Sequence, residues 1–292
     1  MIRNKKIFIC AAFCILSIKY FEQPAYSFIP NVYEPNKKEL ESTSIAIGKT
    51  AAQLIYFGQV KKANQLALLA VKINPKDDRI WAILAETEIR MNKLNKAIES
   101  LNKAKQLNPT FANYWFKEAA ILIQQGKINN AIASINKGLA IDPENSNAYF
   151  QLGNSKFLQK KFNAALIAFK KASSLNPEFW QAINNEGLIL FEIGKKEEAI
   201  EKWKTVLDIK RDAEPLLALA VAIFLTKQDK TLCFVYAKEA LEKNPNYVLP
   251  KYQQEQLWGD LLRKETESFF TSPELTGTVQ KALANATLNN DS

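Results

Sequence analysis

The chain has 292 residues with a formal net charge of +9, and 47% of its residues are hydrophobic. This composition is ordinary for a folded protein and supplies enough apolar residues for a substantial core. The chain has no histidine, so it lacks the usual general base near neutral pH and the commonest metal ligand. Its three cysteines are too few for the disulfide framework that holds many small secreted domains together.

Residues 1–27 combine a basic start with a short apolar run. The apolar stretch 7–18 is shorter than the roughly 20 residues that a membrane-spanning helix needs, and Ala25 and Ser27 are small residues at the two positions that a signal peptidase reads. We therefore expect a signal peptide cleaved after Ser27, or an uncleaved anchor. Either would carry the following residues across a membrane, into a periplasm or a thylakoid lumen, or hold them at that membrane.

Residues 28–43 connect this leader to the main part of the chain. Pro30 and Pro35 indicate an extended linker, because proline cannot donate a backbone hydrogen bond and restricts the residue before it. We expect a long helix to start near Lys37 and to continue into the first of the units described next.

Prolines and small residues each recur every 34 residues along most of the chain. One series is Pro75, Pro109, Pro143, Pro177 and, two steps later, Pro245. A second series of small residues is Ala63, Ala97, Ala131, Ala165, Ala199 and Cys233. A fixed period of this length is typical of one helical hairpin that is copied and stacked. Since a stacked array presents a long surface rather than an enclosed pocket, this pattern favours binding over catalysis.

Each unit is interpreted as two amphipathic helices joined by a tight turn. Small residues at fixed positions let the two helices approach to the roughly 8–10 Å of close packing. Gly58, Gly126 and Gly194 lie between the helices, where glycine permits a left-handed turn. Counting from the prolines, the units are 44–77, 78–111, 112–145, 146–179, 180–213 and 214–247.

The fourth unit carries the family pattern most completely, in Tyr149, Leu152, Gly153, Ala165, Phe169, Ala172 and Pro177. These residues closely resemble the tetratricopeptide repeat. The resemblance implies an all-α fold, an α-solenoid of about six helix-turn-helix units with terminal capping helices. The pattern weakens towards the end: Arg211 stands at the proline position of the fifth unit, and Val221 and Cys233 replace the usual small residues of the sixth.

Residues 248–286 follow the last unit and are expected to cap it. We expect one helix over 250–270, with an apolar face towards the array and a polar face outwards. Ser272 precedes a proline and an acid, the pattern of a helix start, and indicates a last helix ending near Ala286. The polar tail 287–292 is expected to be disordered.

No arrangement of residues indicates a catalytic, cofactor or metal site. Cys10 and Cys14 lie in the leader, so a mature chain would keep only Cys233, too few thiolates for a zinc site. The positive charge comes mostly from lysine, whereas proteins that read base edges commonly use arginine. We therefore expect no enzyme, no cofactor, no metal and no nucleic-acid partner.

The resemblance also implies which side chains line the concave groove, from fixed positions of each first helix. Beyond Arg79, Glu86 and Arg90, the peptide-groove candidates are Asn113, Phe116, Lys117, Asn147, Phe150, Gln151, Asn154, Phe157, Gln181, Asn184, Asn185 and Phe191. Amide side chains can both donate to and accept from an extended peptide backbone. The phenylalanine rings would hold apolar side chains of that peptide.

The expected function is a non-enzymatic scaffold that binds a protein segment in this groove and helps to assemble or stabilise a membrane-associated complex. Two alternatives stay open. Segments 30–36 and 253–259 are similar to exported tetratricopeptide-repeat proteins of cyanobacteria and plastids, which implies an assembly factor for a photosynthetic complex. The lysine-rich edges would also suit a tether to a membrane surface. The identity of the partner and the oligomeric state do not follow from the sequence.

Overall fold

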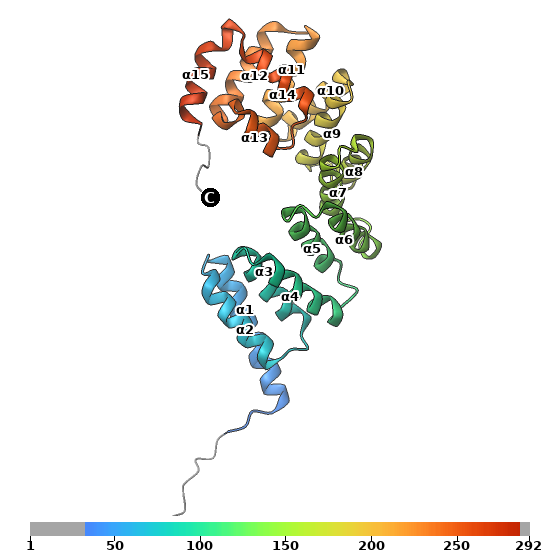
Figure 1. Ribbon diagram of the computed structural model, residues 1–292, viewed down its shortest axis with the longest axis vertical. Helices are drawn as coiled ribbons and strands as arrows, with labels where there is room; N and C mark the ends of the chain where they lie inside the picture. The colour runs from blue at the N-terminus through green and yellow to red at the C-terminus, as the bar shows by residue number, and fades with distance from the viewer. Residues whose placement is uncertain (1–32, 287–292) are drawn as a thin grey trace, which may run out of the picture.

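The computed structural model describes residues 33–286, and within this range it consists of helices and connecting turns without a strand. The first twelve helices form six antiparallel hairpins (Figure 1). Their bounds are α1 (Lys37–Tyr56) and α2 (Val60–Ile73), α3 (Asp78–Arg90) and α4 (Leu94–Leu107), α5 (Ala112–Gln124) and α6 (Ile128–Ile141), α7 (Ser146–Leu158) and α8 (Phe162–Leu175), α9 (Trp180–Glu192) and α10 (Lys196–Ile209), α11 (Ala213–Thr226) and α12 (Lys230–Lys243). The predicted all-α solenoid is confirmed.

The hairpins stack in chain order along a curve. Each second helix packs on the first helix of the next hairpin, from α2 on α3 to α10 on α11. Figure 1 shows α1–α4 at one end of the molecule and α11–α15 at the other, with α6–α8 between them. This arrangement lets the core grow by stacking, as expected for an array whose units contact mainly their neighbours.

A left-handed residue ends the first helix of each of the first five hairpins. Gly58, Gly126 and Gly194 have φ angles of 72°, 71° and 81°, in the region that glycine adopts without a Cβ penalty. Asn92 and Lys160 take the same place in the second and fourth hairpins with φ of 56°. For lysine this conformation costs about 1–2 kcal/mol, so the turn geometry is kept even where the sequence opposes it.

Aromatic rings occupy the space that missing Cβ atoms leave inside the hairpins. A Cβ on Gly153 would lie 2.5 Å from the Phe169 ring, and one on Gly187 would lie 2.6 Å from the Trp203 ring. Phe169 and Trp203 are almost completely buried. Each glycine therefore packs directly against an aromatic ring of the same hairpin, which explains why small and large residues both recur with the repeat.

Arg211, at the missing proline position, has an interaction of its own. Its guanidinium donates to both carboxylate oxygens of Glu239 on α12, at 2.7 and 2.5 Å, and lies over the ring of Tyr236. An ion pair therefore connects the fifth and sixth hairpins at the boundary where other units have proline. Cys233, also on α12, is fully buried in the core between these hairpins.

The chain after α12 differs from the prediction of one helix over 250–270. The elements are η1 (Pro245–Val248), α13 (Pro250–Glu255), α14 (Asp260–Phe270), η2 (Pro273–Leu275) and α15 (Thr276–Asn285). Leu257 has a φ of 63°, which ends α13 and turns the chain before α14 starts. The reason is a contact with α9, described below, that needs a helix N-terminus at Asp260.

The predicted leader 1–27, the first part of the linker and the tail 287–292 lie outside the described residues. Between residues 33 and 286, no helix combines the length and the apolar character needed to cross a membrane.

Candidate functional site

The first helices of the hairpins line the inner side of the curve. Successive first helices contact one another, as α1 does with α3, α5 with α7, and α9 with α11. Figure 1 shows α5 on the inner side of the bend and α6 on the outer side. We call the surface formed by α1, α3, α5, α7, α9 and α11 the inner face. It is the surface on which the sequence placed the groove residues.

The inner face is basic where α3 and α5 meet. Lys117 of α5 contacts one carboxylate oxygen of Glu86 at 2.5 Å, and Arg90 contacts the other at 3.0 Å. Burial works against ionisation of Glu86, but the hydrogen bonds and charges of Lys117 and Arg90 outweigh it, so its pKa lies below the usual value. Two cations thus share one carboxylate, and this part of the surface keeps a positive charge.

Amide side chains meet where α7 and α9 adjoin. Asn185 donates from Nδ2 to the Oδ1 atom of Asn154 over 3.1 Å, and Asn184 donates to Asn185 over 3.3 Å. The structure therefore brings together three of the predicted groove residues. Of these three, Asn154 is half-buried and keeps some contact with solvent, whereas Asn185 is 9% exposed and Asn184 is 1% exposed.

The predicted phenylalanines divide into surface and core. Phe150 is half-buried and packs between Phe169 and Phe179, with centroids 5.7 and 4.9 Å away. Phe157 is also half-buried. Phe116 is buried, with its ring at the position where Gly138 has no Cβ. These rings pack against other aromatic rings of the array, and only Phe150 and Phe157 keep part of their surface accessible.

The remaining groove candidates are accessible. Asn113 and Asn147 are exposed, and Lys117, Gln151 and Gln181 are partly exposed. All five lie on the first helices α5, α7 and α9. A partner could reach these side chains without any change in the fold.

The chain's own helix α14 covers the inner face at α9 and α11, which it contacts. The Glu192 carboxylate, at the end of α9, accepts hydrogen bonds from the backbone N–H groups of Leu261 and Leu262, at 3.2 and 2.9 Å. It therefore caps the N-terminus of α14, where the helix dipole favours negative charge. Burial raises the pKa of Glu192 despite these hydrogen bonds. A Cβ on Gly259 would collide with this carboxylate, so the close approach requires glycine.

A second carboxylate holds the turn before α14. Trp258 donates from its indole Nε1 to Glu214 of α11 over 2.9 Å. Burial raises the pKa of Glu214 to about 7, although part of the residue stays accessible. On α14, the side chains of Leu262, Thr266 and Phe269 are fully buried. The cap is thus part of the core rather than a loosely attached segment.

This cap changes the expected extent of the groove. The structure places Asn184, Asn185 and Phe191 of α9 in the interior rather than on an accessible surface, and Phe116 is buried separately, inside the third hairpin. Phe191 is fully buried and packs against Trp203, with centroids 6.0 Å apart. The sequence predicted a capping helix but not that its N-terminus would rest on Glu192, an interaction between residues far apart in the chain. The accessible part of the inner face is formed by α1, α3, α5, most of α7 and the start of α9, where Gln181 stays partly exposed. At the end of α7 the cap comes close, since Lys160 pairs with Asp260 of α14 at 3.3 Å.

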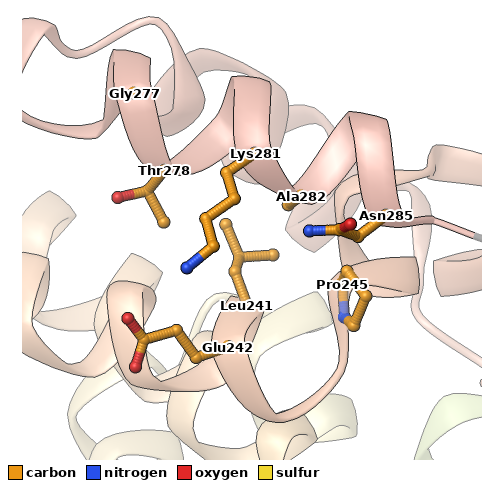
Figure 2. Close-up of a pocket in the computed structure, with 8 residues that line it drawn as sticks. All are labelled: Leu241, Glu242, Pro245, Gly277, Thr278, Lys281, Ala282 and Asn285. Atoms are coloured by element: carbon orange, nitrogen blue, oxygen red, sulfur yellow. The ribbon is translucent and has the colours of Figure 1, made fainter.

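A separate hollow of about 640 Å³ lies at the far end of the molecule, between α12, η1 and α15 (Figure 2). Lys281 of α15 and Glu242 of α12 point towards the same opening, above an apolar floor that includes Leu241 and Ala282. This hollow lies between the last helix and the last hairpin, which also contact each other, and it does not belong to the inner face.

Helical hairpins that repeat every 34 residues and stack around an accessible inner face define a helical-repeat protein of the solenoid class. Family models agree: a TPR repeat model matches residues 119–160, and a tetratricopeptide repeat model matches residues 78–111 and 146–179. The chain therefore contains tetratricopeptide repeats. No curated protein matches it.

Solved structures show the same fold. The Pseudomonas aeruginosa pilF structure is 17% identical with a TM-score of 0.62, covering 80% of this chain and 99% of that one. PilW, described as a widely conserved type IV pilus biogenesis factor, is 19% identical with a TM-score of 0.60, covering 78% and 99%. YrrB, described as having an unusual peptide-binding site, is 19% identical with a TM-score of 0.52, covering 65% and 97%.

Proposed function

We propose that the chain is a non-catalytic scaffold that binds a segment of a partner protein along the accessible inner face of α1, α3, α5 and α7. The observation that carries this proposal is the row of accessible amides on α7. Asn147, Gln151 and Asn154 share one side of that helix, beside the half-buried Phe150 ring. The exposed Asn147 amide can both donate to and accept from a peptide backbone, whereas Gln151 offers its Nε2 group as a donor because its Oε1 atom is buried. The Phe150 ring can contact an apolar side chain.

We further propose that this binding helps to assemble or stabilise a complex at a membrane. Support comes from the basic start and apolar stretch of residues 1–27, which are typical of a segment directed to a membrane. The fold is shared with PilW, a type IV pilus biogenesis factor, and with YrrB, which has a peptide-binding site. The photosynthetic-complex alternative stays a prediction, tested by photosystem levels in a deletion strain.

The test compares two triple variants of the full-length tagged chain, purified from its own cells after mild crosslinking. The groove variant carries Asn147→Ala, Gln151→Ala and Asn154→Ala on a first helix. The control variant carries the same kind of change at the exposed asparagines of second helices, Asn102→Ala, Asn130→Ala and Asn163→Ala. Circular dichroism checks whether both variants remain helical.

We expect one or more proteins to co-purify with the wild type and the control variant and to be lost from the groove variant. Mass spectrometry would identify them. If the groove variant keeps every partner while the control variant loses one, binding occurs on the outer side of the array and the proposal is wrong.

A further inference from the structure

The turn between α1 and α2 exposes two aromatic rings. Tyr56 is 86% exposed and Phe57 is 69% exposed, and their rings meet edge to face with centroids 5.3 Å apart. The corresponding positions of the next hairpin hold Arg90 and Met91, so the repeat does not need aromatic residues here. A pair of large exposed rings without a structural role is typical of a contact surface, since aromatic residues are enriched in such surfaces.

An open hollow of about 730 Å³ lies directly beside this pair. It is lined by Gly58, Gln59, Val60, Lys61, Lys62, Arg90 and Met91. Val60 and Met91 are partly buried and supply apolar atoms, whereas Lys61 and Lys62 are exposed. The hollow and the two rings together are called the aromatic-basic patch. It offers space for an apolar side chain next to positively charged groups.

The positive charge of the patch is not neutralised locally. Within residues 33–286, no carboxylate lies within ion-pair distance of Lys61 or Lys62; the Lys62 ammonium donates to the Gln59 side chain over 3.1 Å. Arg90 does have a partner, but it shares the Glu86 carboxylate with Lys117. The patch therefore complements a negatively charged ligand.

The aromatic-basic patch is continuous with the inner face. Tyr56 ends α1 and Arg90 ends α3, at corresponding positions of two neighbouring first helices. Arg90 also joins the patch to Glu86 and Lys117, which lie on the accessible inner face between α3 and α5. A segment bound along α7 and α5 would reach the patch by continuing towards the N-terminal end of the array.

We propose that the patch binds an acidic segment of the partner protein that carries one bulky apolar side chain. That side chain packs against Tyr56 and Phe57 beside the hollow, and the flanking carboxylates pair with Lys61, Lys62 and Arg90. A flat lipid surface would leave the hollow unfilled, which favours a protein segment. The inference rests on the proposed function, because it assigns the chemistry of one end of the same bound segment.

The probe is a fluorescein-labelled peptide with four acidic residues on each side of a central tryptophan, titrated with the full-length chain by fluorescence anisotropy. Two comparison peptides replace the tryptophan by serine, or all acidic residues by lysine. The patch variants are Tyr56→Ser/Phe57→Ser and Lys61→Gln/Lys62→Gln. The matched control, Ile167→Ser/Lys170→Gln/Lys171→Gln, removes an exposed apolar residue and two exposed lysines from α8.

We expect the acidic tryptophan peptide to bind best, and each patch variant to weaken it at least tenfold while the matched control does not. The lysine-to-glutamine variant should also reduce the salt dependence, since fewer charges are screened. The groove variant described above should bind this short probe normally. The two proposals can therefore fail separately. If the groove variant loses the natural partner and the patch variants keep it, the proposed function stands and this inference does not.

Two results would overturn the inference. One is equal binding of the acidic and lysine peptides, or no binding of either. The other is sedimentation of the chain with phosphatidylserine vesicles that the patch variants abolish, while peptide binding is the same for all variants. That second result would assign the patch to a membrane surface.

Discussion

Glu118 on α5 and Glu186 on α9 are buried carboxylates at the same position of the third and fifth hairpins, and their lysine and serine partners have changed places. Glu118 binds Lys105 of the preceding hairpin at 2.5 Å and accepts from Ser134 of its own hairpin at 2.8 Å. A buried carboxylate needs a counter-charge, because desolvation otherwise costs several kcal/mol.

The fifth hairpin supplies the same two groups from the opposite sides. Lys202 of its own second helix contacts Glu186 at 2.6 Å, and Ser173 of the preceding hairpin donates at 2.5 Å. Both buried glutamates are therefore neutralised by a lysine, but the lysine comes from the preceding hairpin for Glu118 and from the same hairpin for Glu186. The repeat pattern alone does not show this exchange, since lysine and serine are both ordinary helix residues.

This exchange predicts that the lysine beside Glu118 can be moved from position 105 to position 134. Lys105→Ser leaves Glu118 buried without a cation and should lower the free energy of unfolding by about 3 kcal/mol. Adding Ser134→Lys reproduces the arrangement of the fifth hairpin and should restore most of the loss. Urea unfolding followed by circular dichroism measures both. An unchanged midpoint in the single variant would show that the ion pair contributes no net stability.

The glycine positions predict opposite effects of the same substitution. Gly153→Ala places a Cβ against the Phe169 ring and should destabilise the protein by about 1–3 kcal/mol. Gly48→Ala, inside α1, places a Cβ 3.6 Å from Ile80 and Ile83, an ordinary contact, and should stabilise by up to about 1 kcal/mol through helix propensity. Thermal melts of both variants test the contrast, and equal shifts would argue against the ring-against-glycine packing.

Glu214 predicts a dependence of stability on pH. Its neighbours are Trp258 and Asn184, which donate to it, and Asp212 and Tyr247, which lie near enough to interact electrostatically. Burial raises its pKa from 4.5 to about 7, so the folded state binds its proton more tightly than the unfolded state. Stability from this group is complete below about pH 4.5 and is lost as the pH rises through about 7, by an amount of the order of 3 kcal/mol.

Unfolding midpoints between pH 4.5 and 8 check this sign. Glu214→Gln should flatten the decline, although Glu192, whose pKa is also raised, keeps part of it. Glu239→Gln serves as the control, because its pKa is lowered by Arg211 and its contribution has the opposite sign. A wild-type midpoint that rises steadily over this range would contradict the assignment.

Glu192 and Gly259 should be energetically coupled. Gly259→Ala forces a Cβ into the Glu192 carboxylate and should displace the start of α14. Glu192→Ala alone removes the cap and should cost about 0.5–2 kcal/mol, a typical value for a lost N-cap. In the double variant the collision is absent, so the second substitution should add little. Hydrogen exchange at the Leu261 and Leu262 amides reports the same coupling locally, and additive effects would rule out the close contact.

The repeat made much of this fold predictable, and its limits have physical causes. Periodic prolines and small residues indicate hairpins because each unit must solve the same packing problem. Asn92 and Lys160 in left-handed turns were not foreseen, since nothing local favours lysine there; stacking of the neighbours imposes the geometry. The break at Leu257 has no sequence signal beyond Gly259, because it depends on Glu192 in a distant helix.

The candidate site was predictable to a similar extent. The resemblance placed Asn154 and Asn185 on one face, and the structure brings their side chains into a hydrogen bond. It could not show that Asn184 and Phe191 are enclosed, because burial depends on which face of the array the cap covers. The exposed pair Tyr56 and Phe57 was not predicted, because its exposure is a property of the turn between α1 and α2.

The position of α14 divides the molecule into parts that open differently. Along α1–α6, hairpins contact mainly their sequence neighbours, so this part can unravel one hairpin at a time from its free end. The fourth hairpin is tied to α14 by the ion pair between Lys160 and Asp260. Across α9–α15, contacts between Glu192 and Leu262 and between Glu214 and Trp258 close large loops, so these helices must separate together. Hydrogen exchange should therefore be fastest in α1 and α2, and a partner held there would lengthen the lifetime of the half of the chain that opens most easily.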